Sequence, residues 1–386
     1  MEMANDIVIV GAGIAGLTTS LGLHRLGIRS LVLESSESLR VAGFAFATWS
    51  NAWKALDAVG VGDSLRQLHV QSQGGNQEIR CVKRKLLLEA LAKELPSGTI
   101  RYSSKVVCIE DSGWLKLVHL ADGSVIKAKV LIGSDGVNSV VAKWLGFKKP
   151  APVGWSTIRG YADFGNSHGF EPKFMQFFGK GVRCGLLPCD DTTVHWFFTF
   201  TPSTQDKEVE ENPAKMKEFV LNRLGKVPDR VKTAIEITEL EDIICSPLRS
   251  RLPWELLWGI ISKGNVCVAG DALHPMTPNL GQGGCSALED GVILARCLAE
   301  AFPKTPTSQG EEKSEEEEYG RIELALKKFG KERKWRSIDL IATAYMVGFI
   351  QQSDGKVMTF LRDRFLVAFL GRMVLKRSEF DCGKLL

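Results

Sequence analysis

Residues 6–34 carry the pattern that most constrains the fold of this chain. A β-branched apolar run, DIVIV at 6–10, predicts a buried strand, and GAGIAG at 11–16 follows it as a G-x-G-x-x-G turn. Apolar residues at helical spacing come next: Leu17, Leu21, Leu23 and Leu26. A second apolar run at 30–33 ends on Glu34. This order of strand, glycine turn, helix and strand is typical of a Rossmann-type site that binds a dinucleotide.

Each glycine of the turn has its own steric reason. Gly11 permits the tight turn, Gly13 lets a pyrophosphate approach the backbone, and Gly16 lets the helix pack closely on the strand. The other members of the expected contact set are Ala12, Ile14 and Ala15. Glu34 lies eighteen residues beyond Gly16, where its carboxylate is placed to accept hydrogen bonds from a ribose.

A second ligand-binding pattern lies in residues 264–291. Val266–Ala269 predicts a buried strand whose carboxyl end carries Gly270 and Asp271. Two prolines follow, and GQGG at 281–284 precedes a helix that we expect to begin at Ser286. A carboxylate beside bare N–H groups at a helix amino terminus suits sugar hydroxyls and an electron-rich ligand edge. Two such patterns about 250 residues apart predict one long cofactor lying between them.

Composition narrows the class of protein. A length of 386 residues with 44% hydrophobic content supports a large core in two joined domains. The 49 basic and 45 acidic residues are mixed along the chain, so the net charge of +4 gives no reason to expect nucleic acid as a partner. Nine cysteines without a CxxC pair predict free thiols in a reducing compartment, the cytoplasm. We expect no signal peptide and no transmembrane segment.

Three regions are expected along the chain. Residues 1–150 and 262–335 form the nucleotide-binding domain, with a strand excursion near 68–80 and a hairpin that turns at 121–124. Long aromatic-rich strands between 151 and 261 predict a sheet that walls an apolar pocket. Residues 336–386 are expected to form a helical segment.

Two segments late in the chain have unusual composition. Proline, serine and a glutamate cluster between Pro303 and Glu318 predict a solvated, mobile loop. Between Phe360 and Leu375 the apolar residues are spread around a predicted helix without a clean stripe, and basic residues interrupt them. Packing of this helix on the main body is therefore favoured over contact with a membrane surface.

Three motifs in this order resemble the signature set of the class A flavoprotein aromatic hydroxylases. They are GAGIAG at 11–16, IGSDGVNS at 132–139 and GDALHPMTPNLGQGG at 270–284. The resemblance covers roughly residues 6–300 and points to the plant-type monooxygenases related to zeaxanthin epoxidase and salicylate hydroxylase. It implies an α/β fold with a Rossmann-like FAD-binding domain of the glutathione-reductase type, a mixed β-sheet substrate domain and C-terminal helices.

The same resemblance assigns FAD to the two binding patterns. The pyrophosphate would lie over Gly11–Gly16, Glu34 would bind the adenosine ribose, and Arg84 would reach the ribityl or phosphate region. Asp271 would bind a ribityl hydroxyl. The backbone of Gly281–Gly284 would face the pyrimidine edge, where the helix dipole favours the negative charge of reduced flavin. The remaining positions expected to bind the cofactor are Ser35, Val106, Gly270, Pro278, Gln282 and Gly283.

Asp135 and Gly136 match the Asp-Gly pair that in this family serves both FAD binding and the transient docking of NADPH. The family's motif often ends in an arginine, whereas this chain has Ala142, so part of the expected electrostatics for NADPH is missing. Residues 43–46, Gly-Phe-Ala-Phe, replace a smaller Gly-x-Gly-Ile segment and are expected to narrow the space beside the flavin. Both departures leave the assignment of FAD intact.

His195 is the candidate for a base that removes the proton of a phenolic substrate. The alternative, which we favour, is a hydrogen-bonded histidine on a sheet face. His274 is expected to position the backbone of its loop. No two of the six histidines stand at ligand spacing, so no metal site is expected.

The resemblance implies a monooxygenase. NADPH, or NADH, would reduce FAD, dioxygen would add at the flavin C4a position, and the hydroperoxide would deliver oxygen to a small aromatic or isoprenoid-like metabolite. Two alternatives stay open. One is a flavin oxidase, dehydrogenase or reductase on the same fold, and the other is a non-catalytic flavin-fold protein that binds lipidated partners. The expected partner is a small molecule, and the expected state is a monomer or homodimer.

Overall fold

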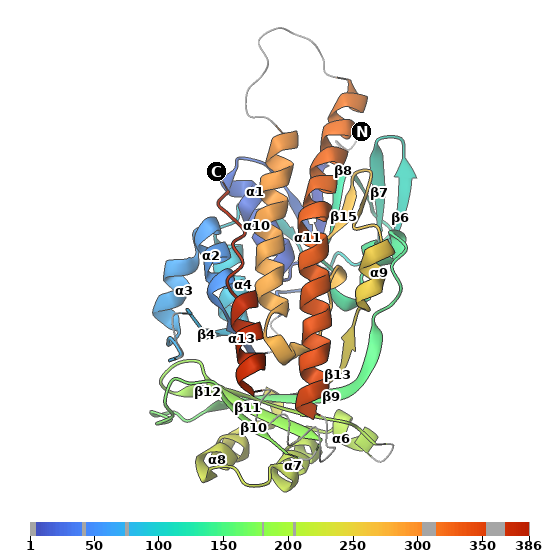
Figure 1. The fold of residues 1–386 in the computed structure, drawn as a ribbon. Helices are drawn as coiled ribbons and strands as arrows, with labels where there is room; N and C mark the ends of the chain where they lie inside the picture. Colours follow the sequence, from blue (N-terminus) through green and yellow to red (C-terminus); the bar gives the residue numbers. More distant parts are fainter. Residues whose placement is uncertain are drawn as a thin grey trace.

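The computed structural model describes residues 5–40, 44–73, 77–179, 181–203, 206–302, 314–352 and 367–385. Within these residues the chain forms an eight-stranded sheet, a five-stranded sheet and a two-stranded ribbon. Figure 1 shows α10 (Gly283–Ala301) and α11 (Glu315–Gln352) side by side, with the five-stranded sheet across their lower ends. The predicted α/β fold class with a Rossmann-like domain is confirmed.

The eight-stranded sheet forms the nucleotide-binding half. Its parallel core has the order β15, β8, β1, β2, β5, and the antiparallel strands β14, β7 and β6 extend it. The bounds are β1 (Asn5–Val10), β2 (Leu31–Leu33), β5 (Ile100–Arg101), β6 (Val106–Ser112), β7 (Leu115–Leu120), β8 (Val125–Gly133), β14 (Ser262–Lys263) and β15 (Val266–Val268). The predicted strand at 6–10, the hairpin around 121–124 and the strand at 266–269 are confirmed.

Helix α1 (Ile14–Arg25) follows β1 and the glycine turn, as predicted, and packs closely on α10. Small residues permit this approach. A Cβ added to Gly22 would lie 2.7 Å from the Cβ of Ala295, and a Cβ added to Gly291 would lie 2.6 Å from that of Thr18. Because α1 starts at the first glycine turn and α10 at the second, this contact fixes the two turns relative to each other.

The second half of the molecule is built on the sheet β10, β11, β12, β9, β13. All its strand pairs are antiparallel, so the expectation of a mixed sheet is wrong here; short hairpins join β10 to β11 and β11 to β12. The bounds are β9 (Ala151–Asp163), β10 (Met175–Phe178), β11 (Val182–Pro188), β12 (Thr193–Phe200) and β13 (Ile243–Ser250).

Strict alternation gives this sheet two different faces. On β12 the buried residues Trp196, Phe198 and Phe200 pack with Met216 and Val220 in one apolar cluster. The helices on that side are α7 (Pro213–Arg223) and α8 (Asp229–Ile237), seen beneath the sheet in Figure 1. The alternate residues of β12, which stand between these buried aromatic residues in the sequence, lie on the opposite face of the sheet, toward the nucleotide-binding half.

The remaining elements surround these sheets. The ribbon consists of β3 (Ala45–Thr48) and β4 (Arg80–Lys83). The helices are α2 (Ser50–Val59), α3 (Gly62–Leu68), α4 (Arg84–Lys93), α5 (Val140–Trp144), α6 (Lys207–Glu211), α9 (Pro253–Trp258) and α13 (Val367–Arg377). The predicted strand excursion at 68–80 is wrong for most of its described length, because α3 ends at Leu68 and only a single bridge joins Gln71 to Arg80.

Two other expectations require correction. Helix α10 begins at Gly283 rather than at Ser286, because Gly283 and Gly284 already have helical backbone. The expected loop from Pro303 to Glu318 is wrong for Glu315–Glu318, which form the first turn of α11, where acidic side chains favour the positive end of the helix. Residues 303–313 lie outside the described residues. Helix α11 is continuous across the boundary drawn between 335 and 336.

A buried cluster of charges joins α10, α11 and the turn after β15. The carboxylate of Asp290 accepts hydrogen bonds from the Gly270 amide at 2.7 Å, from His274 at 2.7 Å and from Arg333 at 2.6 Å. Arg333 also pairs with Glu289 at 2.8 Å. Asp290, His274, Glu289 and Arg333 are all fully buried. A buried charge is tolerated only when it is paired and hydrogen-bonded, so these contacts lock the three segments together.

The described part of the C-terminal segment packs on the main body. Met373 and Val374 of α13 contact a cluster that includes Leu280, Leu340 and Val347. Most of the segment from Phe360 to Leu375 lies outside the residues whose side chains are described. No helix in the described ranges has the length and apolar character needed to cross a bilayer.

We predict that Asp290→Asn lowers the free energy of unfolding by about 3–5 kcal/mol, because it leaves Arg333 partly unpaired in the interior. Urea denaturation would measure the loss. The control is Glu94→Gln, which breaks an exposed pair with Arg25 and should cost less than about 1 kcal/mol.

The free energy of unfolding that Asp290→Asn removes should depend on pH. Burial alone would raise the pKa of Asp290, but His274 and Arg333 outweigh it and lower the pKa from 3.8 to about 2. A carboxylate with a depressed folded pKa stabilises the fold above its unfolded pKa, and this stabilisation disappears as the pH falls toward 2. The difference between wild type and Asp290→Asn should therefore narrow below pH of about 4. A difference that stays constant across this window would contradict the assignment.

Candidate functional site

The first glycine turn meets the turn after β15 at the carboxyl edge of the parallel strands. A Cβ added to Gly270 would lie 2.9 Å from the Cβ of Ala15, so the turns are in direct contact. Gly11 has φ of +102°, and its added Cβ would lie 2.5 Å from the carbonyl oxygen of Ser134, in the turn after β8. An added Cβ at Gly16 would collide with the carbonyl of Gly11. These contacts explain why Gly11, Gly16 and Gly270 are glycines.

Gly13 differs from the other glycines of its turn. Its φ is −82°, which any residue adopts, and nothing lies within 4 Å of an added Cβ. The space in front of this backbone is therefore open, as the approach of a pyrophosphate requires. Ala12 donates its amide to Glu34 at 3.0 Å, which ties the turn to the end of β2.

Glu34 is buried at the end of β2. Its other carboxylate oxygen accepts from the hydroxyl of Ser35 at 3.2 Å and from the amide of Ser36 at 2.9 Å. The Ser104 amide donates to the Glu34 carbonyl at 2.7 Å, which places the start of β6, with the buried Val106, beside it. Glu34, Ser35 and Val106, predicted to bind the cofactor, thus lie in one region next to the first glycine turn.

Arg84 and Asp271 lie near enough to interact electrostatically. Arg84 is the first residue of α4, and its amide donates to the carbonyl of Phe44, a residue held in the left-handed conformation at φ 55°. Burial lowers the pKa of Arg84, and Asp271 partly offsets this. The Arg84 Nε is buried and has no hydrogen-bond partner among the described residues. Asp271, in contrast, is exposed.

Asp135 has a structural partner set of its own. Its carboxylate accepts from the Ser139 hydroxyl at 2.5 Å and from the Val140 amide at 2.7 Å, so it organises the start of α5. Gly136 follows with φ of +77°. Ala142 is buried in α5, where its amide donates to Ser139. The Asp-Gly pair therefore shapes the turn that contacts Gly11, and the missing arginine falls at a core position.

The amino terminus of α10 presents free backbone donors. Gly281 has φ of +63°, the side chain of the N-cap residue Gln282 accepts from Asn51 rather than from the helix amides, and the first turn contains no acidic residue. An added Cβ at Gly284 would lie 2.5 Å from the ring of Phe46. Phe46 therefore narrows the space beside this helix end, as expected from the motif, whereas Gly43 lies outside the described residues.

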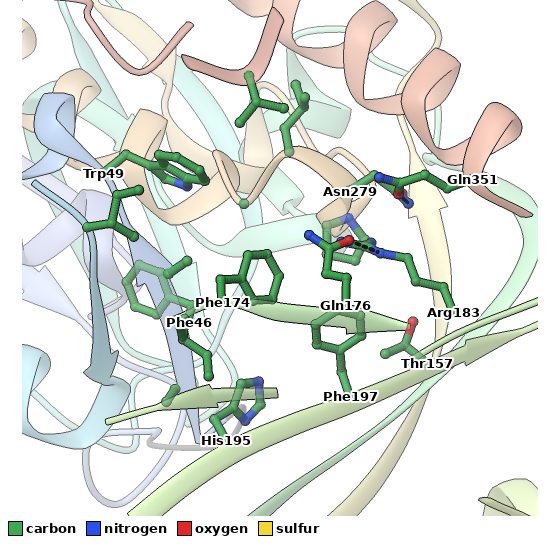
Figure 2. Close-up of a pocket in the computed structure, with 18 of the residues that line it drawn as sticks. Phe46, Trp49, Thr157, Phe174, Gln176, Arg183, His195, Phe197, Asn279 and Gln351 are labelled. Carbon is green, nitrogen blue, oxygen red and sulfur yellow. Dashed lines mark hydrogen bonds between the residues drawn. The ribbon is translucent and has the colours of Figure 1, made fainter. Parts of the chain in front are cut away.

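A cavity of about 570 Å³ lies between this helix end and the five-stranded sheet. Pro278–Gly281 and Phe46 line it on the nucleotide-binding side, and Gln351 lines it on the side of α11. Figure 2 shows Phe46, Trp49 and Phe174 on one side and Gln176, Arg183 and Thr157 on the other, with Phe197 rising from the sheet. The volume is in the range of about 300–1,000 Å³ that is typical of small-molecule sites.

His195 lies on β12 in the wall of this cavity. Its Nδ1 bonds the carbonyl of Gly160 at 3.1 Å, so Nδ1 carries the proton and Nε2 is an acceptor in the neutral ring. Burial and the nearby Arg159 lower the pKa of His195 to about 3. Such a weak base has little driving force to deprotonate a phenol. The geometry favours a neutral hydrogen-bond acceptor over the general base that we considered.

Two residues of the cavity were missed by the motifs. Arg159 on β9 and Arg183 on β11 share the sheet face of His195 and Phe197. Arg183 stands in a strand of otherwise apolar or small residues, which is a signal for a functional cation. The strand of Arg159 also contains Ser156, Thr157 and Asp163, so only the strand register shows that both arginines face the cavity. His274, expected to position backbone, bonds the same Asp290 oxygen that accepts from the Gly270 amide and is part of the buried charge cluster. No group of three or more His, Cys, Asp and Glu within the described ranges could hold a metal ion.

Comparisons with known proteins agree with this geometry. A family model described as FAD binding domain matches residues 116–318, and one described as Lycopene cyclase protein matches residues 6–180. Monooxygenase 2 of Arabidopsis thaliana is 58% identical over 405 residues, which cover 100% of this chain and 99% of the relative. Zeaxanthin epoxidase, chloroplastic, of an Oncidium hybrid cultivar is 28% identical over 89% of this chain and 55% of its own length.

A solved structure shares the fold. The crystal structure of Klebsiella pneumoniae HpxO complexed with FAD and uric acid superposes with a TM-score of 0.78 at 21% identity, over 97% of this chain and 96% of that one. The fold and the paired glycine turns define a flavoprotein with a Rossmann-like FAD-binding domain. The chain belongs to the class A flavin-dependent monooxygenases, an oxidoreductase family, and is related to zeaxanthin epoxidase.

We predict that Gly13→Ala weakens FAD binding by about 10- to 100-fold without changing the melting temperature. The methyl group meets no protein atom, but it would enter the space expected for the pyrophosphate at a cost of about 1–3 kcal/mol. Titration of apoprotein with FAD would measure the dissociation constant. Gly320→Ala, an open position on α11, is the control. Unchanged affinity in Gly13→Ala would place the pyrophosphate elsewhere.

We predict that His195 does not titrate between pH 5 and 8, because its pKa is lowered to about 3. Histidine side-chain NMR spectra would show this, with the His195→Gln variant identifying the resonance that belongs to position 195. A midpoint between about 6 and 7 for that resonance would restore the imidazole as a candidate base.

Proposed function

We propose that this chain is an FAD-dependent monooxygenase that uses NADPH, or NADH, and dioxygen to hydroxylate or epoxidise a small aromatic or isoprenoid-like metabolite. The observation that carries the proposal is the position of the cavity. It is lined by Pro278–Gly281, which lead into the uncapped end of α10, and by the aromatic face of the five-stranded sheet. A substrate in this cavity would lie directly beside the expected flavin edge.

The residues present fit FAD in three places. The open space at Gly13 suits a pyrophosphate, and the unpartnered Nε of Arg84 beside the exposed Asp271 suits the phosphate and sugar hydroxyls that follow. The bare amides at Gly283 and Gly284 suit an electron-rich ring edge. When bound and reduced by the nicotinamide, FAD would supply the activation of dioxygen and the transfer of one oxygen atom.

The chain's own residues would hold the reactants and exclude water. The positive end of α10 stabilises negative charge at the adjoining ring edge. The walls of the cavity keep bulk water from the reacting atoms, because most of them are apolar or aromatic, among them Phe46, Trp49, Phe174 and Phe197. His195 would accept a hydrogen bond at Nε2 from a substrate hydroxyl and so orient it.

A second candidate is a flavin oxidase, dehydrogenase or reductase on the same fold. Two observations favour it: Ala142 replaces the arginine of the Asp-Gly motif, and the Asp135 carboxylate already binds Ser139 and Val140. The first removes a positive charge that could attract the phosphates of NADPH, and the second leaves fewer free acceptor positions on the Asp135 carboxylate. A non-catalytic flavin-fold protein is the remaining alternative.

We predict that the purified protein carries flavin absorption and that NADPH reduces it under anaerobic conditions. Mixing with ¹⁸O-labelled dioxygen and a panel of phenols, aromatic acids and terpenoids should then give a product with one labelled oxygen, measured by mass spectrometry. Peroxide release equal to NADPH consumption, with no labelled product from any acceptor, would favour the oxidase. Protein that neither contains nor takes up FAD would leave only the non-catalytic alternative.

A further inference from the structure

Helix α9 and the segment that follows it carry large apolar side chains that the described part of the chain leaves exposed. Their exposed fractions rise from 38% to 79% in the order Leu257, Trp254, Ile260 and Trp258. Residues 253–263 contain a single acid, Glu255, and its carboxylate pairs with Arg251 at 3.2 Å. Apolar side chains that gather on a surface usually mark a place where something binds. We call these four side chains the α9 patch.

Lysines stand next to the α9 patch. Lys334 of α11 donates from Nζ to the carbonyl of Leu257 at 2.7 Å. Lys148, which follows α5, lines a small pocket of about 280 Å³ together with Trp258 and Ile260. Three more exposed lysines belong to the same segments of the chain: Lys149, Lys263 and Lys331. Among the residues with described positions, none of these five lysines forms an ion pair, so the surroundings of the patch carry unbalanced positive charge.

The α9 patch lies away from the cavity and stands on a packed base. Figure 1 shows α9 beside α11, on the opposite side of the molecule from α2 and α3, whereas the cavity lies against the five-stranded sheet. Leu256 of α9 is fully buried, and an added Cβ at Gly259 would lie 2.8 Å from the ring of Phe147. The guanidinium of Arg251 lies 4.4 Å from the centre of the same ring. These contacts hold α9 in place without using its exposed side chains.

The size and charge of the α9 patch discriminate between its possible occupants. A stable interface between two proteins uses roughly 20–30 residues on each side, many more than this patch and its lysines supply. A two-fold contact with a second copy of the chain would also bring the same lysines together, because both copies use the same surface. An anionic lipid surface instead attracts lysines, and tryptophan rings are favoured at the level of the headgroups.

We propose that the α9 patch binds the surface of an anionic lipid bilayer. Trp254, Trp258 and Ile260 enter the boundary between headgroups and acyl chains, to a depth of about 5–10 Å. The unpaired lysines lie at the level of the lipid phosphates, where each strengthens binding about fivefold. The contact is peripheral and does not depend on the proposed function, because no residue of the α9 patch lines the cavity.

Sedimentation of the full-length protein with sucrose-loaded vesicles tests the proposal. Vesicles of phosphatidylcholine alone are compared with vesicles in which about 40% of the lipid is phosphatidylglycerol, which carries a negative charge. The bound fraction at increasing lipid concentration gives the partition coefficient. We expect it to be at least about tenfold higher on the anionic vesicles at low salt. In about 1 M salt, where the Debye length is about 3 Å, it should fall to the value for phosphatidylcholine.

Variants locate the contact on the protein. Trp258→Ser should weaken binding to the anionic vesicles about tenfold, because it removes the most exposed apolar side chain of the patch. The double variant Lys148→Gln with Lys149→Gln should weaken it about 25-fold, through the loss of two charges. The controls are Leu68→Gln and Lys226→Gln, which remove an exposed apolar side chain and an exposed lysine elsewhere and should bind like the wild type. The melting temperature of each variant establishes that it is folded.

Vesicles with brominated acyl chains report which side chains enter the bilayer, because bromine quenches the fluorescence of nearby tryptophan. The bound wild type should lose part of its tryptophan emission, and Trp258→Phe should bind almost as well with a smaller loss. Three results would overturn the proposal: equal binding to both kinds of vesicle at low salt, patch variants that bind like the wild type, or bound protein without quenching. A dimer that forms without lipid and is lost in Trp258→Ser would assign the α9 patch to a second copy instead.

Discussion

The buried carboxylate of Asp290 is the interaction on which the rest of the site depends. It accepts hydrogen bonds from the Gly270 amide, from His274 and from Arg333, and so it binds the turn after β15, the helix α10 and the helix α11 to one point. No single one of these segments could place the amino terminus of α10. Because Gly270 also lies against Ala15, the contacts of Asp290 fix the turn after β15 relative to the first glycine turn.

The elements that Asp290 joins also position both ends of the expected cofactor site. The close packing of α1 on α10, which small residues permit, sets the separation between the Gly11–Gly16 turn and the Gly281–Gly284 turn. The cavity begins where the second turn ends, and the five-stranded sheet closes it from the other side. Cofactor and substrate sites are therefore neighbours through one shared segment, Pro278–Gly281. Such sharing suits chemistry in which an atom passes from one bound molecule to the other.

The sequence predicted what local rules control. The strand at 6–10, the glycine turn and the following helix were correctly expected, since each depends on residues adjacent in the chain. The start of α10 was placed three residues late, after the GQGG run, and the first turn of α11 was taken for a loop because its glutamates resemble a solvated run. The two errors have different causes: glycine has low helix propensity, so the start of α10 is not marked by its residues, whereas the exposed glutamates of α11 favour a helix that their charged composition concealed.

Contacts between residues distant in the chain could not be predicted from the sequence. Asp290 and Arg333 lie forty-three residues apart, and nothing in the periodicity of either helix marks them as partners. Arg159 and Arg183 became a pair only through the antiparallel register across β12. His195 was considered as a base, whereas its lowered pKa follows from burial and from Arg159, which only the folded arrangement brings near.

The central claim is that two turns from distant parts of the chain hold one FAD molecule whose ring end borders the cavity. A crystal structure of the protein with FAD tests this most directly. We expect electron density for the pyrophosphate in front of Gly13 and for the isoalloxazine ring beside the amides of Gly283 and Gly284. Density for the ring away from the α10 terminus, or FAD bound at only one of the two turns, would contradict it.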